Sequence, residues 1–94
     1  MTINDFADTL NLRIEIHRRC NFSDKNATWY ASFDNVEIKD GPILKGEYGN
    51  GANPTQALRD YVERIKGKLI VHHAFSKELR REFNVPDSIT FDGF

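Results

Sequence analysis

The sequence predicts an α+β fold in the order helix, three strands, helix, two strands (α-β-β-β-α-β-β), with an antiparallel sheet packed against one main helix. Apolar and polar residues alternate with a period of two from Leu12 onward, which is the pattern of strands with one buried face. After the Gly-rich run at 49–51 the apolar spacing changes to three and four residues, as in an amphipathic helix. No repeat or linker interrupts this order, so residues 1–94 are expected to form a single domain.

The N-terminal helix is expected over residues 1–11, because Thr2 and Asp5 are spaced like the ends of a capping box. A three-strand meander is expected over residues 12–48. In its first strand Leu12, Ile14 and Ile16 point inward and the charged residues between them point outward.

In the second strand Trp29, Ala31 and Phe33 are expected to face the core, while Tyr30 and Ser32 face away. This strand is expected to continue through Ile38, with a bulge near residues 34–35. A turn at residues 40–42 leads to a third strand over 43–48, and the glycines of 49–51 are expected to end it.

The main helix is expected over residues 53–66, with Asn53 as the N-cap and Pro54 at the first helical position. Gly67 is placed where a left-handed C-terminal cap belongs. A C-terminal hairpin follows over 68–85 and a tail over 86–94. Two alternatives stay open for the tail, whose apolar residues either dock on the body or stay loose; they are Ile89, Phe91 and Phe94.

The charge balance excludes a global basic field of the kind that drives non-specific nucleic-acid binding, since the formal net charge is -1. The apolar runs are too short to span a bilayer, and the first ten residues carry two aspartates where a signal peptide would be cationic and then apolar. The single Cys20 is typical of a reducing compartment. A cytoplasmic protein with no membrane partner is therefore expected.

The element order from about Thr2 to Lys66 resembles the double-stranded-RNA-binding domain (dsRBD-like). The segments 30–34 and 54–57 are similar to the HicB antitoxin core, in which an aromatic strand is followed by a Thr-x-x-Ala helix start (HicB-like). The segments 48–51, 57–61 and 65–68 also resemble small uncharacterised phage and prophage proteins. The chain lacks the lysine cluster with which double-stranded-RNA binders contact phosphate and the Pro-Gly-Cys turn of HicB proteins.

The sequence predicts no catalytic residue, metal site or cofactor. The glycines from Gly46 to Gly51 match neither a dinucleotide fingerprint nor a P-loop, so a structural bend is favoured. His72 and His73 are neighbours on a strand and are expected to point to opposite faces, which favours surface or capping histidines over a metal pair. His17 and Cys20 lack an orienting motif for nucleophilic catalysis, and the chain is predicted not to be an enzyme.

Two surface groups are the candidate binding residues. The first is a basic and aromatic patch on the outer face of the first two strands, consisting of Arg13, His17, Arg18, Arg19 and Tyr30. The second is an acidic patch around the meander turn, consisting of Asp34, Glu37, Asp40 and Glu47. The simpler interpretation of the first patch is a charged strand face that is exposed to solvent. The simpler interpretation of the second patch is that its charges keep the protein soluble.

The leading hypothesis from these observations is a non-enzymatic phage-type accessory protein that binds a host or defence protein. The alternatives are a nucleic-acid-binding module, including a HicB-like antitoxin, and a protein that sequesters a small ligand. Pairing of two copies of the chain through an edge strand is a further partner hypothesis.

Overall fold

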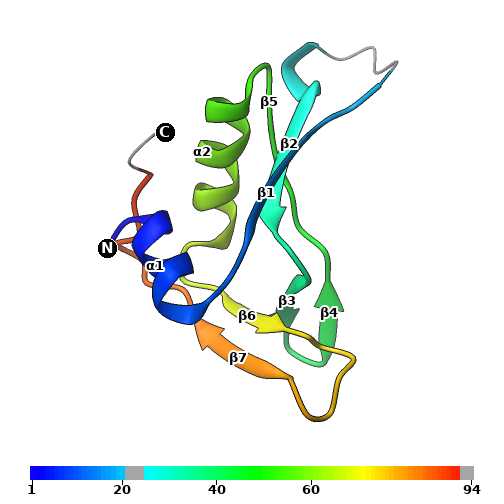
Figure 1. The fold of residues 1–94 in the computed structure, drawn as a ribbon, viewed down its shortest axis with the longest axis vertical. Helices are drawn as coiled ribbons and strands as arrows, with labels where there is room; N and C mark the ends of the chain where they lie inside the picture. Colours follow the sequence, from blue (N-terminus) through cyan, green and yellow to red (C-terminus); the bar gives the residue numbers. More distant parts are fainter. Residues whose placement is uncertain (21–24, 92–94) are drawn as a thin grey trace.

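The computed structural model describes residues 1–20 and 25–91, and within them the chain forms two α-helices and two antiparallel sheets (Figure 1). The predicted α+β fold class is confirmed. In chain order the elements are α1 (Ile3–Leu10), β1 (Ile14–Arg18), the short 3₁₀ helix η1 (Lys25–Ala27), β2 (Trp29–Phe33), β3 (Val36–Asp40), β4 (Ile43–Lys45), β5 (Gly49–Gly51), α2 (Pro54–Ile65), β6 (Leu69–His72) and β7 (Arg81–Asn84).

Both helices begin at the caps that the sequence predicts. The hydroxyl of Thr2 accepts a hydrogen bond from the Asp5 amide at 3.1 Å, and the Asn53 side chain accepts one from the Gln56 amide at 2.9 Å. These bonds satisfy amides that have no partner within the helix. Helix α2 is followed by Gly67 at φ +67°, the left-handed conformation expected of a C-terminal glycine.

The strands form one three-stranded sheet in the order β1-β2-β5 and one four-stranded sheet in the order β4-β3-β6-β7. The expectation of a single sheet is therefore wrong. The expected second strand divides into β2 and β3, which lie in different sheets. The expected third strand over 43–48 is β4 alone, and β5 follows it in the other sheet. β2 pairs with β1 and β5, while β3 pairs with β4 and with β6 of the C-terminal hairpin.

The second strand breaks at a corner and not at the expected bulge. Asn35, between β2 and β3, has φ 58°, so the chain turns out of the first sheet into the second. The amide of Asp34 still donates to the carbonyl of Arg13 at 2.7 Å, and the amide of His73 donates to the carbonyl of Asn35 at 3.1 Å. The corner is therefore bonded to both sheets.

The glycines at 49–51 form strand β5, so the prediction that they end a strand is wrong. A Cβ at Gly49 would meet the carbonyl oxygen of Ala57 and the amide nitrogen of Tyr61 in α2, and a Cβ at Gly51 would also meet the backbone of Ala57. Glycine is required at Gly49 because the backbone of α2 lies directly against this strand.

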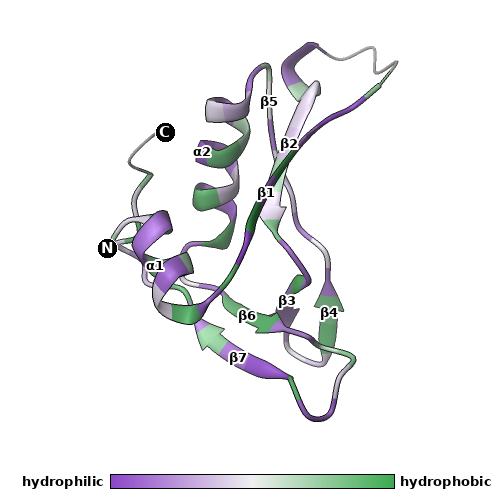
Figure 2. Ribbon diagram, viewed as in Figure 1, coloured by the Kyte–Doolittle hydropathy of each residue, from purple (hydrophilic) through white to green (hydrophobic). Residues whose placement is uncertain are grey.

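The core lies between the helices and the inner face of the β1-β2-β5 sheet, which is the face that Ala31 and Phe33 share, and it continues to Val36, Ile38 and Ile70 of the second sheet. The ring of Phe33 packs against Phe6 of α1 with centroids 6.1 Å apart and against Tyr61 of α2 with centroids 5.6 Å apart. In Figure 2 hydrophobic and hydrophilic residues alternate around α2, as expected of a helix with one buried side. Neither helix covers the opposite, outer face of this sheet at Tyr30 and Ser32.

The C-terminal tail docks on the body as far as the structure describes it. Ile89 is fully buried, and Thr90 pairs with Thr2 in a parallel bridge in which the Ile3 amide donates to the Thr90 carbonyl at 2.8 Å. Phe91 packs against the core, whereas Phe94 lies outside the described residues. Among the described helices none has the length and apolar character needed to cross a bilayer.

Candidate functional site

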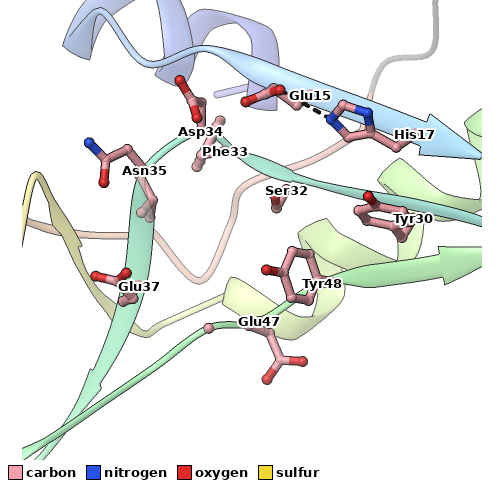
Figure 3. A pocket seen from close by; sticks show the side chains of 12 residues that line it. Glu15, His17, Tyr30, Ser32, Phe33, Asp34, Asn35, Glu37, Glu47 and Tyr48 are labelled. Atoms are coloured by element: carbon pink, nitrogen blue, oxygen red, sulfur yellow. Dashed lines mark hydrogen bonds and ion pairs between the residues drawn. The ribbon is translucent and has the colours of Figure 1, made fainter.

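A pocket of about 290 Å³ opens where the outer face of the β1-β2-β5 sheet meets the corner into β3 and the β4–β5 connection (Figure 3). Its walls come from β1, β2, the corner, the start of β3 and residues 46–48. The lining residues are Glu15, His17, Tyr30, Ser32, Phe33, Asp34, Asn35, Val36, Glu37, Gly46, Glu47 and Tyr48. The pocket thus contains residues from both groups that the sequence singled out.

Aromatic rings form one side of the pocket. His17 and Tyr30 are cross-strand partners, and their rings stack with centroids 5.3 Å apart. The ring of Tyr48 meets Tyr30 edge to face with centroids 5.6 Å apart, and Tyr48 is about half exposed at 49%. Figure 3 shows the Tyr48 hydroxyl pointing into the space between the strands. Sequence reasoning included Tyr48 in neither patch. Its contact with Tyr30 follows from the pairing of the next residue, Gly49, with Ala31 of β2, which depends on β5 being a strand.

The three arginines of the predicted basic patch do not act together. The guanidinium of Arg19 lies over the Tyr30 ring at 4.5 Å and donates to the carbonyl of Ala27 at 2.6 Å. Arg18 is at the strand position of the inner face, because side chains alternate along β1 and Arg18 pairs with Trp29. Arg13 is exposed before β1 and does not line the pocket.

Two of the acidic residues that line the pocket have a side-chain partner. Glu15 Oε2 lies 3.1 Å from His17 Nε2, and the dashed line in Figure 3 marks this contact. Glu47 accepts a bond from Arg64 of α2 at 3.0 Å, so its carboxylate points away from the pocket. Asp40, the fourth residue of the predicted acidic patch, lies 3.9 Å from Lys45 and outside the pocket.

Glu37 differs from these carboxylates. The residue is only partly exposed, and its Oε2 atom is buried with no hydrogen-bond donor of the described residues within reach. Leaving a buried acceptor of this kind unpaired costs on the order of 1–3 kcal/mol relative to a bonded one.

An ion-pair network fixes the β4–β5 connection against α2. Asp60 Oδ2 accepts bonds from the Asn50 amide and from Arg64 Nε, each at 2.8 Å, while Arg64 also bonds Glu47. The hydrogen bond to Asp60 raises the pKa of Arg64 above its usual value. The network holds residue 47, and with it the neighbouring Tyr48, at one edge of the pocket.

The two adjacent histidines lie side by side, so the prediction that they point to opposite faces is wrong. Their ring centroids are 4.0 Å apart because His73 follows the end of β6 with φ 54°. His72 is buried and not a surface histidine, and its Nδ1 accepts a bond from Arg81 at 3.0 Å. Burial lowers the pKa of His72, and the nearby charges of His73 and Arg81 act in the same direction.

No group of three or more potential metal ligands occurs among the residues that the structure describes. Cys20 is exposed. A second pocket, of about 390 Å³, lies between α1 and β7 and has mainly apolar walls that include Met1, Phe6 and Phe83. A third pocket, of about 210 Å³, has charged walls of both signs, from Lys39, Asp40, Lys45, Glu47, Arg64 and Lys68. The pocket of Figure 3 differs from both in combining aromatic rings with acidic residues.

Comparison with known proteins gives no match, whether with family models, curated sequences or solved structures. The resemblances to double-stranded-RNA-binding domains, HicB antitoxins and phage proteins stay predictions from the sequence.

Proposed function

We propose that the chain is a non-enzymatic binding module that acts in the cytoplasm and binds a protein partner through the outer face of the β1-β2-β5 sheet. One observation carries the proposal: the pocket on this face combines an exposed tyrosine, Tyr48, with stacked rings and several carboxylates. Aromatic residues are enriched at protein interfaces, and charges around them select a partner of complementary charge.

The sequence resemblance to small phage proteins indicates the cellular context in which the module would act. A phage-encoded module of this kind would bind a host or defence protein and change its activity without chemistry of its own. This context, including an anti-defence role, rests on the sequence patterns at 48–51, 57–61 and 65–68.

The nucleic-acid alternative is less well supported by the site. Arg18 and Arg19 are on opposite faces of the β1 strand and its exit, and Arg19 already bonds the Ala27 carbonyl. Carboxylates beside them repel phosphate, whose binding depends on accumulated positive charge. Titration with duplex RNA and DNA at two salt concentrations tests this alternative, because phosphate-driven affinity falls steeply with salt.

The proposed function is tested by partner capture from a bacterial lysate with wild type and two single variants. Tyr48→Ala removes the exposed ring at the pocket, and Phe75→Ala removes a ring that is 87% exposed on the β6–β7 connection. We expect wild type and Phe75→Ala to retain a stoichiometric partner that Tyr48→Ala loses. Absence of any stoichiometric partner, or its loss only in Phe75→Ala, would contradict the proposal.

A further inference from the structure

The charge of the pocket is mainly negative. The lining includes the acidic residues Glu15, Asp34 and Glu37, and no lysine or arginine. Glu47 also lines the pocket but directs its carboxylate to Arg64. The chain as a whole is close to neutral, with a formal net charge of -1, so this negative charge is local. A pocket with such walls attracts a cationic group and repels an anionic one.

Two residues of the pocket lining can contact a flat cation. The exposed ring of Tyr48 offers an aromatic surface, and Glu37 offers a carboxylate whose Oε2 has no donor among the described residues. This oxygen is buried, so a ligand contacts it after the Glu37 side chain rotates toward the pocket. A guanidinium group fits both, because it stacks on aromatic rings and donates several N–H bonds in one plane. A lysine ammonium is a compact and strongly hydrated charge, and it matches the ring less well.

The chain itself contains an example of this contact. Arg19 places its guanidinium 4.5 Å from the centroid of Tyr30, next to the ring of His17. The same aromatic series continues to Tyr48, which no arginine of the described residues covers in this way. A second guanidinium on Tyr48 would extend an arrangement that the sheet already uses.

We propose that this pocket takes an arginine side chain of the protein partner, with the guanidinium between the Tyr48 ring and the Glu37 carboxylate. The proposal rests on the proposed function and gives the chemistry of the partner. The partner is a protein segment that presents an exposed arginine, and the surrounding carboxylates of Glu15 and Asp34 favour further basic residues beside it.

The test is a titration followed by amide chemical shifts in NMR, with three probes that differ only in the side-chain head group. N-acetyl-arginine amide carries the guanidinium, N-acetyl-lysine amide an ammonium, and N-acetyl-citrulline amide a neutral urea of the same shape as the guanidinium. We expect saturable binding of the arginine probe, several-fold weaker binding of the lysine probe and at least about tenfold weaker binding of the citrulline probe.

A matched pair of variants tests the role of Glu37. Glu37→Gln removes its charge, and Glu78→Gln makes the same change at an exposed residue of the β6–β7 connection outside the pocket. We expect Glu37→Gln to weaken arginine binding at least about fivefold and Glu78→Gln to leave it within about twofold. Equal binding of arginine and citrulline, tighter binding of lysine, or equal effects of the two variants would overturn the proposal.

The outcomes separate this inference from the proposed function. If Tyr48→Ala loses a captured protein but the arginine probe does not bind wild type, the interface stands and the arginine chemistry is wrong. If the arginine probe binds as expected but no protein is captured, the pocket chemistry stands and the proposed function is contradicted.

Discussion

Asn35 and His73 are both in the left-handed backbone conformation and are joined by two hydrogen bonds. The His73 amide donates to the Asn35 carbonyl at 3.1 Å, and Asn35 Nδ2 lies 2.7 Å from His73 Nδ1. This pair connects the corner between β2 and β3 to the end of β6. Because Asn35 also lines the pocket, the same corner that divides the two sheets shapes the candidate site.

We predict that Asn35→Ala destabilises the protein more than Asn35→Gly. Alanine loses the side-chain bond to His73 and must also adopt the left-handed conformation, for a combined loss of about 2 kcal/mol. The Asn35→Gly variant loses only the side-chain bond, because glycine adopts φ 58° without steric cost. Urea unfolding of the two variants measures the difference. A glycine variant less stable than the alanine variant would contradict the structural role assigned to this corner.

We predict that Gly49→Ala lowers the free energy of unfolding by at least about 3 kcal/mol, since its Cβ would collide with backbone atoms of Ala57 and Tyr61 that cannot move independently. Gly46→Ala is the control. Its Cβ would approach only the Tyr48 side chain, at 3.9 Å, so a change below about 1 kcal/mol is expected. Thermal and urea unfolding measure both variants. Similar losses in the two would show that β5 is not in contact with α2.

Alkaline pH is expected to destabilise the protein through Tyr61. Burial raises the pKa of Tyr61 to about 12, with a hydrogen bond to the Phe33 backbone acting in the opposite direction. The folded state therefore keeps the proton at pH values where the unfolded chain loses it, and stability falls as the pH rises from about 10 to about 12.

The loss attributable to this one group is on the order of 2–3 kcal/mol over that range. Urea unfolding at pH 9 and pH 11 measures part of it, and Tyr61→Phe is expected to show a smaller loss than wild type between these two values. An equal loss in wild type and variant would mean that the Tyr61 hydroxyl does not carry the alkaline sensitivity.

Mild acid is expected to destabilise the protein through His72. Its pKa is lowered, chiefly by burial, so the unfolded chain takes up a proton before the folded protein does. Stability attributable to His72 is therefore lost as the pH falls below about 6.5. We predict that the difference in unfolding free energy between pH 7.5 and pH 5.5 is smaller in His72→Gln than in wild type. A difference of the same size in both proteins would contradict this assignment.

Local patterns in the sequence predicted the features that depend on near neighbours. The caps at Thr2 and Asn53 and the inward alternation of Ala31 and Phe33 are confirmed, because each depends on residues within a few positions. The tail could not be assigned from local pattern, since the burial of Ile89 depends on the distant N-terminal segment.

The errors arise at contacts between distant segments. The corner at Asn35 is bonded to His73, 38 residues later, and a bulge was the nearest local interpretation. The backbone of α2 packs against Gly49, so glycine occurs there within a strand. When only the neighbouring residues in the sequence are considered, glycine indicates the end of a strand. The lining of one pocket includes Glu37 of one predicted patch and Tyr30 of the other, which no spacing rule within a single strand could reveal.

The most direct measurement of the central claim is the set of intermolecular NOEs between the side-chain methylene protons of N-acetyl-arginine amide and the ring protons of the protein. Binding in the pocket predicts NOEs to Tyr48 and none to Phe83, which lines the second pocket between α1 and β7. NOEs to Phe83, or to the exposed ring of Phe75, with none to Tyr48 would contradict the assignment of the binding site to the outer face of the β1-β2-β5 sheet.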